Sequence, residues 1–383
     1  MLDSLEIKNF RSLENFQVNK LGRINLIVGK NNSGKSTVLE ALRIYAGNAN
    51  KGLLENIAQG HDEKCFLDAS DQDSFNSSLP YEDLFTGRKF PIGEEPIVIG
   101  EINNDAESLE VHHVYLVEKE YSEADNEGKS RLLTRQVSVT DLSKGDYVQR
   151  VGDGLLVLKK ETPVLIDFNK AHPSFTRFML DGDIVPSSFI PTRLIDMQEL
   201  AKDWDVIALT DAEDMIKAAM QIILPKFESL IFVNDSAYSD KTGKETRRLA
   251  KVKIKGLSRP VPLNSLGDGM LRVLQLVLKI FPAKGGFLLI DEFENGLHYS
   301  VQEKVWNLLF ELAEKLDIQV FATTHSWDCV ESFAKVAVEK QGIDGVLFRV
   351  GKSVRNSDKG RVIATVFDEE QLYSITQSDV EVR

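Results

Sequence analysis

The alternation of apolar and polar positions at the start of the chain predicts two short strands, followed by a third strand that leads into a helix. Apolar side chains alternate with polar ones up to Ile7 and recur around residues 16–18. Residues 23–28 are rich in Ile, Leu and Val, and from residue 37 apolar positions recur at helical spacing until Gly47. The pattern therefore places a buried strand directly before an amphipathic helix.

The pattern changes to short β runs between residues 97 and 166, where apolar stretches are separated by Gly, Asp, Asn and Ser. This spacing is typical of an antiparallel meander. Helical periodicity returns after it and stops at Pro225. Residues 59–95 are polar and interrupted by Gly and Pro, which predicts a mobile connection with one short helix near residues 81–85.

The loop between the third strand and its helix has the spacing of a phosphate-binding loop. Gly29 and Gly34 enclose four residues and are followed by Lys35 and Ser36, which is the P-loop pattern. Glycines let successive backbone N–H groups point at phosphate oxygens, and the helix dipole adds positive potential. The residues expected to bind ATP are Gly29, Asn31, Asn32, Ser33, Gly34, Lys35, Ser36 and Thr37. We expect Lys35 to reach the β- and γ-phosphates and Ser36 to ligate Mg²⁺.

A second candidate half of the site follows the apolar run Phe287–Ile290, which ends in Asp291 and Glu292. This reads as a buried parallel strand that delivers carboxylates at its C-terminal end. We expect Asp291 to join the Mg²⁺ shell through water, opposite Ser36, and Glu292 to polarise the water that attacks the γ-phosphate. The alternative interpretation is that the two acids only end an ordinary strand. The presence of a P-loop elsewhere in the chain makes this alternative the weaker of the two.

Two further segments carry candidate site residues. Ser265 and Gly267 directly precede a helical apolar pattern, so they would lie at a helix N-terminus, where anions bind well. The run 321–326 follows another apolar strand and places His325 at its C-terminal end. Both segments would bring polar groups to the edge of a nucleotide site.

The order of these motifs resembles that of ABC-type ATPases. Three features resemble the RecF, SMC and OLD (overcoming lysogenisation defect) group: the early position of the P-loop, the sequence of residues 29–37, and the sequence Ile7-Lys-Asn-Phe-Arg-Ser12. Ser265, Gly267 and Asp268 are similar to the signature motif of that family, although Asn264 and Leu266 depart from its usual leucine and first glycine. The match is closest to an OLD-like ATPase that lacks a Toprim nuclease domain, since no Asp-x-Asp follows His325.

The resemblance implies an α/β fold, a P-loop ABC-type ATPase core with a mixed or parallel sheet flanked by helices, an antiparallel β lobe and an inserted helical region. The expected domains are 1–58 and 236–383 as the two parts of the core, with 59–235 as the insertion. It also implies head-to-tail dimers, in which Ser265, Gly267 and Asp268 of one subunit cap the ATP on the P-loop of the other. Glu292, His325 and Lys35 would be catalytic, and 294–298 would form the D-loop.

The charge of the chain limits the kinds of partner that it can bind. The net charge of −13 argues against wrapping of the whole surface by nucleic acid. Lys251, Lys253 and Lys255 alternate with apolar residues, so a strand there would carry its lysines on one face, as a surface for DNA or an acidic partner. The alternative is a solvated edge strand protected by its lysines.

The sequence contains no apolar run long enough to span a membrane and no signal-peptide pattern at its N-terminus. Its two cysteines, Cys65 and Cys329, are too few for a disulfide scaffold. These features predict a cytoplasmic protein with no membrane partner.

Our first functional hypothesis is a Mg²⁺-dependent ATPase that dimerises on ATP and switches a separate effector, such as a nuclease, or DNA, with phage defence as the setting. The second is a RecF-like DNA-repair ATPase that uses the three lysines. A transporter nucleotide-binding subunit is less consistent with the early P-loop and the altered signature. A scaffold that only binds ATP is disfavoured because Glu292 and His325 are both present.

Overall fold

The computed structural model describes residues 1–63, 80–91, 95–124, 130–143, 147–160, 162–168, 184–239, 246–340, 342–358, 360–367, 371–372 and 374. Cys65 and most of the predicted connection before residue 80 lie outside these ranges. The short helix expected near residues 81–85 is a 3-10 turn over Tyr81–Leu84.

A six-stranded sheet forms the centre of the molecule, in the order β16-β15-β3-β14-β13-β9. All neighbours pair in parallel except β15 and β16. The strands are β3 (Ile24–Val28), β9 (Ser187–Ile190), β13 (Phe287–Ile290), β14 (Gln319–Thr324), β15 (Gly345–Lys352) and β16 (Val362–Phe367). Because β14 lies between β3 and β13, the loops that follow these three strands meet at one edge of the sheet.

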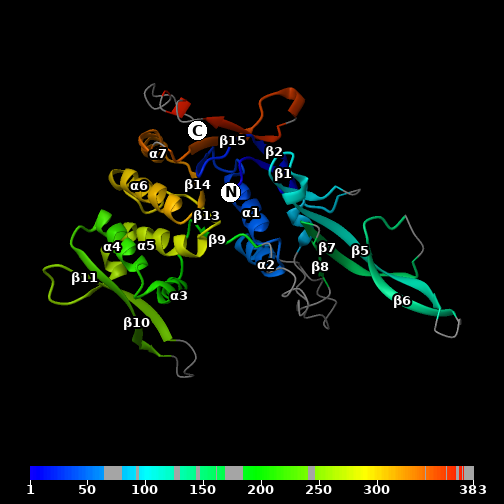
Figure 1. The fold of residues 1–383 in the computed structure, drawn as a ribbon, viewed down its shortest axis with the longest axis horizontal. Coiled ribbons are helices and arrows are strands. Elements are labelled where there is room, and N and C mark those ends of the chain that lie inside the picture. The colour runs from blue at the N-terminus through cyan, green and yellow to red at the C-terminus, as the bar shows by residue number, and fades with distance from the viewer. Residues whose placement is uncertain are drawn as a thin grey trace.

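Helices cover both faces of this sheet (Figure 1). They are α1 (Lys35–Ala46), α2 (Lys51–Gly60), α3 (Met197–Ile207), α4 (Ala212–Ile223), α5 (Asp268–Ile280), α6 (Tyr299–Lys315) and α7 (Trp327–Glu339). On β13, Leu288 and Ile290 join the core with α5, α6 and α7, whereas Phe287 and Leu289 join the core with α1. The strand is apolar throughout because both of its faces are buried.

A second sheet carries the predicted antiparallel meander, in the order β2-β1-β4-β5-β7-β8 with β6 beside β5. Its strands are β1 (Leu5–Phe10), β2 (Leu13–Val18), β4 (Ile97–Gly100), β5 (Leu109–Ala124), β6 (Ser130–Val139), β7 (Gln149–Lys159) and β8 (Thr162–Asp167). Since β4 pairs with β1, strands from both sides of the expected boundary at residue 58 share this sheet. The limits of the expected domains therefore stay a prediction. In this sheet, the β5–β6 hairpin extends away from the core (Figure 1).

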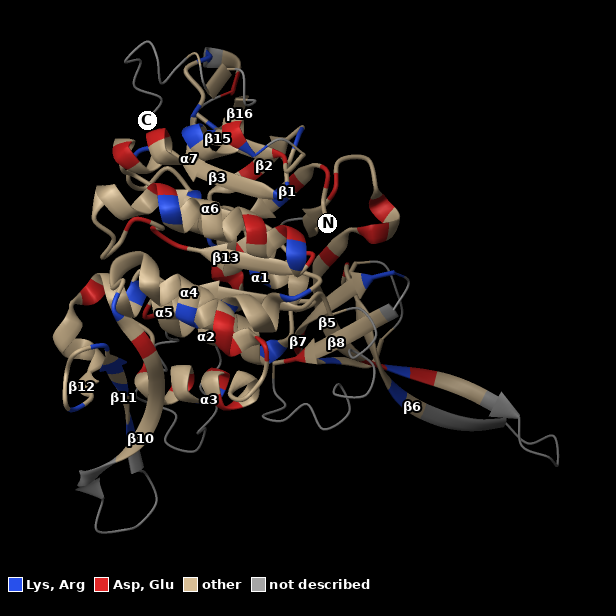
Figure 2. Ribbon diagram, turned by 60° about the vertical axis from the view of Figure 1, so that its left-hand side comes forward, with Lys and Arg blue, Asp and Glu red and all other residues tan. Residues whose placement is uncertain are grey.

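The lysine-bearing segment lies in a three-stranded sheet of β10 (Phe227–Ser239), β11 (Thr246–Ile254) and β12 (Val261–Pro262). Lys251 and Lys253 are exposed while Val252 is buried, so two of the three predicted lysines share a face of β11, and Lys255 follows the end of the strand. The interpretation of β11 as an edge strand fails at Lys251 and Val252, which pair with both β10 and β12, whereas the pairs described for the rest of β11 are with β10. Figure 2 shows the basic residues along β11.

Helices within the described ranges are all too short or too polar to cross a bilayer. After helix α7 the described chain adds the last two strands of the central sheet, β15 and β16.

Candidate active site

The loop between β3 and α1 has the backbone of a phosphate-binding loop. Gly29 has a φ of 154° and Gly34 a φ of 104°, in the region that favours glycine. A Cβ on Gly29 would lie 2.3 Å from the carbonyl oxygen of Val350 and 2.7 Å from Oγ of Ser33. Only glycine fits at this position, and the loop therefore curls tightly before α1.

Two groups in this loop suit a phosphate ligand. The Ser33 hydroxyl is buried and has no hydrogen-bond partner among the described residues. Nζ of Lys35 donates to the carbonyl oxygens of Gly29 at 2.8 Å and Lys30 at 3.2 Å, so the ammonium lies over the loop. Burial lowers the pKa of Lys35, and the nearby acids Asp291, Glu292 and Glu294 oppose that effect.

Asp291 directly follows β13 and faces the first turn of α1. Ser36 Oγ lies 3.2 and 3.3 Å from its two carboxylate oxygens. Thr323 of β14 donates to Oδ1 at 2.7 Å, and Thr192 after β9 donates to Oδ2 at 3.1 Å. The structure thus brings together Ser36 and Asp291, the two expected magnesium residues. A hydroxyl beside a carboxylate is an oxygen donor set that fits Mg²⁺.

Glu292 and His325 meet at the same edge. Glu292 has a φ of 50°, which is uncommon for a residue with a side chain, and its N–H donates to Thr323 Oγ1 at 2.8 Å. Nδ1 of His325 lies 3.7 Å from the Glu292 carboxylate and 3.1 Å from that of Glu294. Glu294 Oε1 also accepts the backbone N–H groups of His325 and Ser326, at 3.0 and 3.1 Å. Glu294 therefore fixes the turn that presents His325.

The signature residues lie on the surface at the start of α5. Ser265 belongs to a 3-10 turn over Leu263–Leu266, and its hydroxyl donates to the carbonyl oxygen of Pro262 at 2.7 Å. Ser265, Gly267 and Asp268 are exposed, and no described atom lies within 4 Å of where a Cβ of Gly267 would be. Asp268 packs against Gly296 of the D-loop segment. Ser265 and Asp268 thus contact Pro262 and Gly296, while Leu266 of the same turn packs against the core.

The sequence-based prediction missed Thr192, Thr323 and Arg272. Both threonines hold the Asp291 carboxylate, and Arg272 of α5 donates to the backbone of Asp291 and Glu292. Arg272 could have been noticed as a charged residue within an apolar helical pattern, because such residues are seldom buried without a specific partner. Nothing in the sequence marks Thr192.

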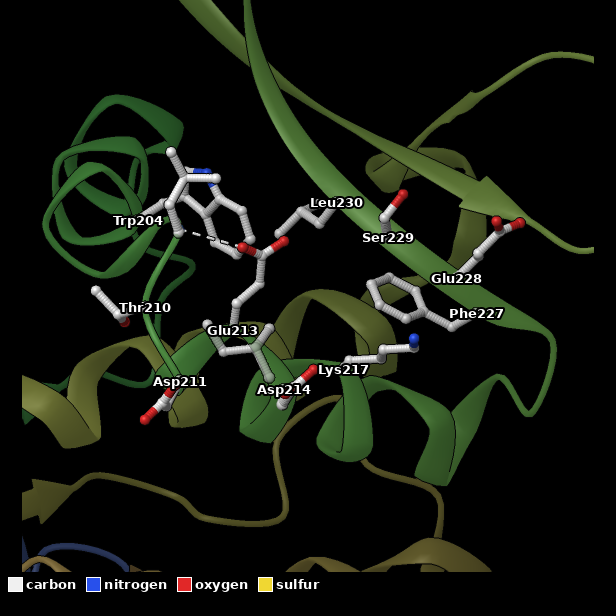
Figure 3. Close-up of a pocket in the computed structure, with 12 residues that line it drawn as sticks. Trp204, Thr210, Asp211, Glu213, Asp214, Lys217, Phe227, Glu228, Ser229 and Leu230 are labelled. Carbon is white, nitrogen blue, oxygen red and sulfur yellow. Dashed lines mark hydrogen bonds between the residues drawn. The ribbon is translucent and has the colours of Figure 1, made fainter.

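A cavity of about 280 Å³ lies elsewhere, between the α3–α4 junction and the start of β10. Figure 3 shows Glu213 beside Trp204, while Asp211 and Asp214 point away from that ring. Oε2 of Glu213 accepts the N–H of Leu209 at 3.2 Å. None of the predicted site residues lines this cavity, so the nucleotide site is assigned to the P-loop edge of the sheet on its geometry.

Comparisons with known proteins bear on the class of the protein. Residues 1–147 match the family model "AAA ATPase domain", and residues 217–328 match "AAA domain, putative AbiEii toxin, Type IV TA system". An "ATP/GTP phosphatase" of Helicobacter pylori is 24% identical over 356 residues, which cover 89% of each chain. An uncharacterised protein of Methanocaldococcus jannaschii is 32% identical over 91 residues, covering 24% of this chain and 79% of its own length.

Among solved structures, an SMC head bound to the C-winged helix domain of ScpA is similar in fold, with a TM-score of 0.50 at 14% identity. The match covers 96% of this chain and 98% of that one. The fold and the P-loop site define a P-loop ATPase. Within that class, the fold is similar to that of an SMC head, in line with the sequence-based resemblance, and the OLD subtype stays a prediction.

Proposed function

We propose that this ATPase forms a head-to-tail dimer when it binds Mg²⁺-ATP and that hydrolysis in the dimer switches a separate effector. The observation that carries the proposal is the exposed turn 265–268. No side chain of the described residues caps α5, so the first N–H groups of the helix are available to a phosphate. Because Ser265, Gly267 and Asp268 are exposed, this turn is open to ATP bound on the P-loop of a second subunit.

In this proposal each side chain has one role at the composite site. The P-loop N–H groups and Lys35 bind the β- and γ-phosphates, while Ser36 and Asp291 hold Mg²⁺, which neutralises phosphate charge when bound. Glu292 orients the attacking water and accepts its proton. His325, held by Glu294, lies beside Glu292 and senses the γ-phosphate.

The dimer predicts a specific effect of Ser265→Arg. The bulky cation would block the approach of the partner's nucleotide, so the variant should stay monomeric with ATP while its own P-loop binds ATP normally. Sedimentation velocity with ATP measures the first property and nucleotide titration the second. Ser258→Arg is a matched control, because Ser258 is exposed and lies outside the turn. A wild-type protein that remains monomeric at saturating ATP contradicts the proposal.

The target of the switch is proposed to be a separate effector, such as a nuclease, in a cytoplasmic defence against phage. The motif resemblance to OLD-type ATPases supports this setting. The matched family description that names a toxin of a type IV system is compatible with it. Reading the neighbouring gene for a Toprim-like Glu and Asp-x-Asp pattern is the simplest test of a nuclease effector.

Direct binding of DNA is the second candidate, and the exposed lysines of β11 favour it. Lys253 is paired with Glu228 at 2.7 Å, which reduces the charge available to DNA. The ATP hydrolysis rate, measured with and without linear duplex DNA, separates the two candidates. Stimulation by DNA favours a DNA-directed ATPase, and an unchanged rate favours a protein target.

If DNA is the target, replacing Lys251, Lys253 and Lys255 by Glu should abolish DNA binding and leave ATP binding intact. The reason is that phosphate contacts dominate the affinity, and each lost contact should lower the salt slope by about one. Fluorescence anisotropy with labelled duplex DNA at several salt concentrations measures the DNA affinity and its dependence on salt. The control, which changes the charge equally, replaces the exposed residues Lys20, Lys89 and Lys284 by Glu. Unchanged DNA affinity in the β11 variant rules out this surface.

A further inference from the structure

Arg272, on the second turn of α5, is buried against Asp291 and Glu292, the two residues after β13 that we call the catalytic turn. It is 1% exposed. Its Nη2 donates to the carbonyl oxygens of Asp291 at 2.8 Å and Glu292 at 2.7 Å, and its Nη1 donates to that of Pro191 at 3.0 Å. One guanidinium therefore joins α5 to the ends of β13 and β9. Burial lowers the pKa of Arg272 to about 10, while the neighbouring acids keep the charged form favoured at neutral pH.

The backbone held by Arg272 is the one that presents the expected general base. Glu292 adopts a left-handed φ of 50°, a conformation that persists only where its surroundings enforce it. Two groups hold it: Arg272 binds its carbonyl oxygen, and Thr323 accepts its N–H. A planar guanidinium can reach three carbonyl oxygens at once, which a lysine ammonium cannot do with the same geometry.

The first turn of α5 also contacts Gly296, four residues after Glu292. A Cβ on Gly269 would lie 3.1 Å from the carbonyl oxygen of Gly296, and a Cβ on Gly296 would lie 3.5 Å from the carbonyl oxygen of Asp268. The helix begins directly after the exposed turn that carries Ser265 and Gly267. A displacement of this turn would thus be transmitted along α5 to the backbone of Glu292, because packed helices move as rigid units.

We propose that Arg272 is a positioning residue that couples the two ATP sites of the dimer. When the turn 265–268 of one subunit engages the partner's ATP, α5 shifts and Arg272 sets Glu292 of its own subunit for hydrolysis. This inference rests on the proposed head-to-tail dimer. It adds that the two sites hydrolyse ATP cooperatively and that the link runs through one side chain.

The test compares Arg272→Lys with Lys279→Met in the full-length protein. Lys279 is a suitable control because it is a second buried cation on α5, but it pairs with Glu199 and Asp203 of α3 instead of the catalytic turn. The wild type should show a Hill coefficient for ATP well above 1 and approaching about 2, the number of sites. Arg272→Lys should lower kcat by about 100-fold, as expected for a misplaced catalytic group. It should also bring the Hill coefficient to about 1, with ATP affinity measured at the P-loop unchanged.

A purely structural role for Arg272 gives another result. Arg272→Lys would then lower the melting temperature as Lys279→Met does, while kcat per folded protein and the Hill coefficient stay at the wild-type values. That outcome overturns the coupling and leaves the proposed dimer intact. A wild type that hydrolyses ATP as a monomer, by contrast, overturns both.

Hydrogen exchange keeps the proposal testable if Arg272→Lys fails to fold. ATP should slow exchange at the N–H groups of Glu292 and Phe293, which bond to Thr323, in the wild type. Ser265→Arg, a surface change at the far end of the coupling path, should lose that ATP-dependent protection. Equal protection in both proteins means that the catalytic turn does not sense the signature turn, which overturns the inference.

Discussion

Glu292→Gln is expected to abolish most ATP hydrolysis and to trap the protein as an ATP-bound dimer. Glutamine keeps the size of the side chain and its place beside His325 but cannot accept the proton of the attacking water. Loss of a general base typically lowers a rate by about 100- to 10,000-fold. Binding of ATP through Lys35 and Ser36 should remain, so the closed state would form and persist.

The measurement pairs a steady-state ATPase assay with sedimentation velocity in Mg²⁺-ATP. Glu303→Gln is the control for the loss of a carboxylate, since Glu303 lies on α6 and pairs with Lys335. It should hydrolyse ATP like the wild type. A Glu292→Gln protein that stays monomeric with ATP would count against the whole site model.

Lys35→Ala has the second large expected effect, which is loss of ATP binding. Its ammonium donates two hydrogen bonds, to the loop carbonyl oxygens of Gly29 and Lys30. In the ATP complex, phosphate oxygens would replace these two acceptors. Hydrogen bonds to charged groups contribute about 1.5–3 kcal/mol each, so the affinity should fall by at least about 100-fold. Isothermal titration calorimetry measures the dissociation constant for ATP of the variant and of the wild type.

Lys30→Ala is the matched control, because Lys30 is an exposed lysine of the same loop that contributes only its carbonyl oxygen to Lys35. It should bind ATP with nearly the wild-type affinity. If Lys35→Ala bound as tightly as Lys30→Ala, the loop would not be the phosphate site.

The local elements of the site could be predicted because short stretches of sequence determine them. The apolar runs before Gly29 and Asp291 become β3 and β13, and the helical pattern after the P-loop becomes α1, since each depends on burial and backbone geometry within a few residues. The ATPase class followed from the same segments and is confirmed by the comparisons.

Long-range pairing could not be predicted in the same way. The pattern of β4 indicates a strand but not that it pairs with β1, and that of β11 does not show that β12 covers its far side. Arg272 and Thr192 were missed because their roles depend on carbonyl and carboxylate groups that are distant in sequence and meet only in the folded sheet. Cross-strand contacts of this kind follow from topology, which the local pattern does not specify.

Mixing two inactive variants tests the central claim, the head-to-tail dimer, most directly. Lys35→Ala keeps an intact signature turn, and Ser265→Arg keeps an intact P-loop, so each alone should be nearly inactive. In a mixed dimer the P-loop of one and the signature turn of the other form one complete site. An equal mixture should therefore form ATP-dependent dimers in sedimentation velocity, while each variant alone stays monomeric, and about half of the random pairs are mixed. No ATP-dependent dimer on mixing, with both variants folded, would contradict the head-to-tail arrangement.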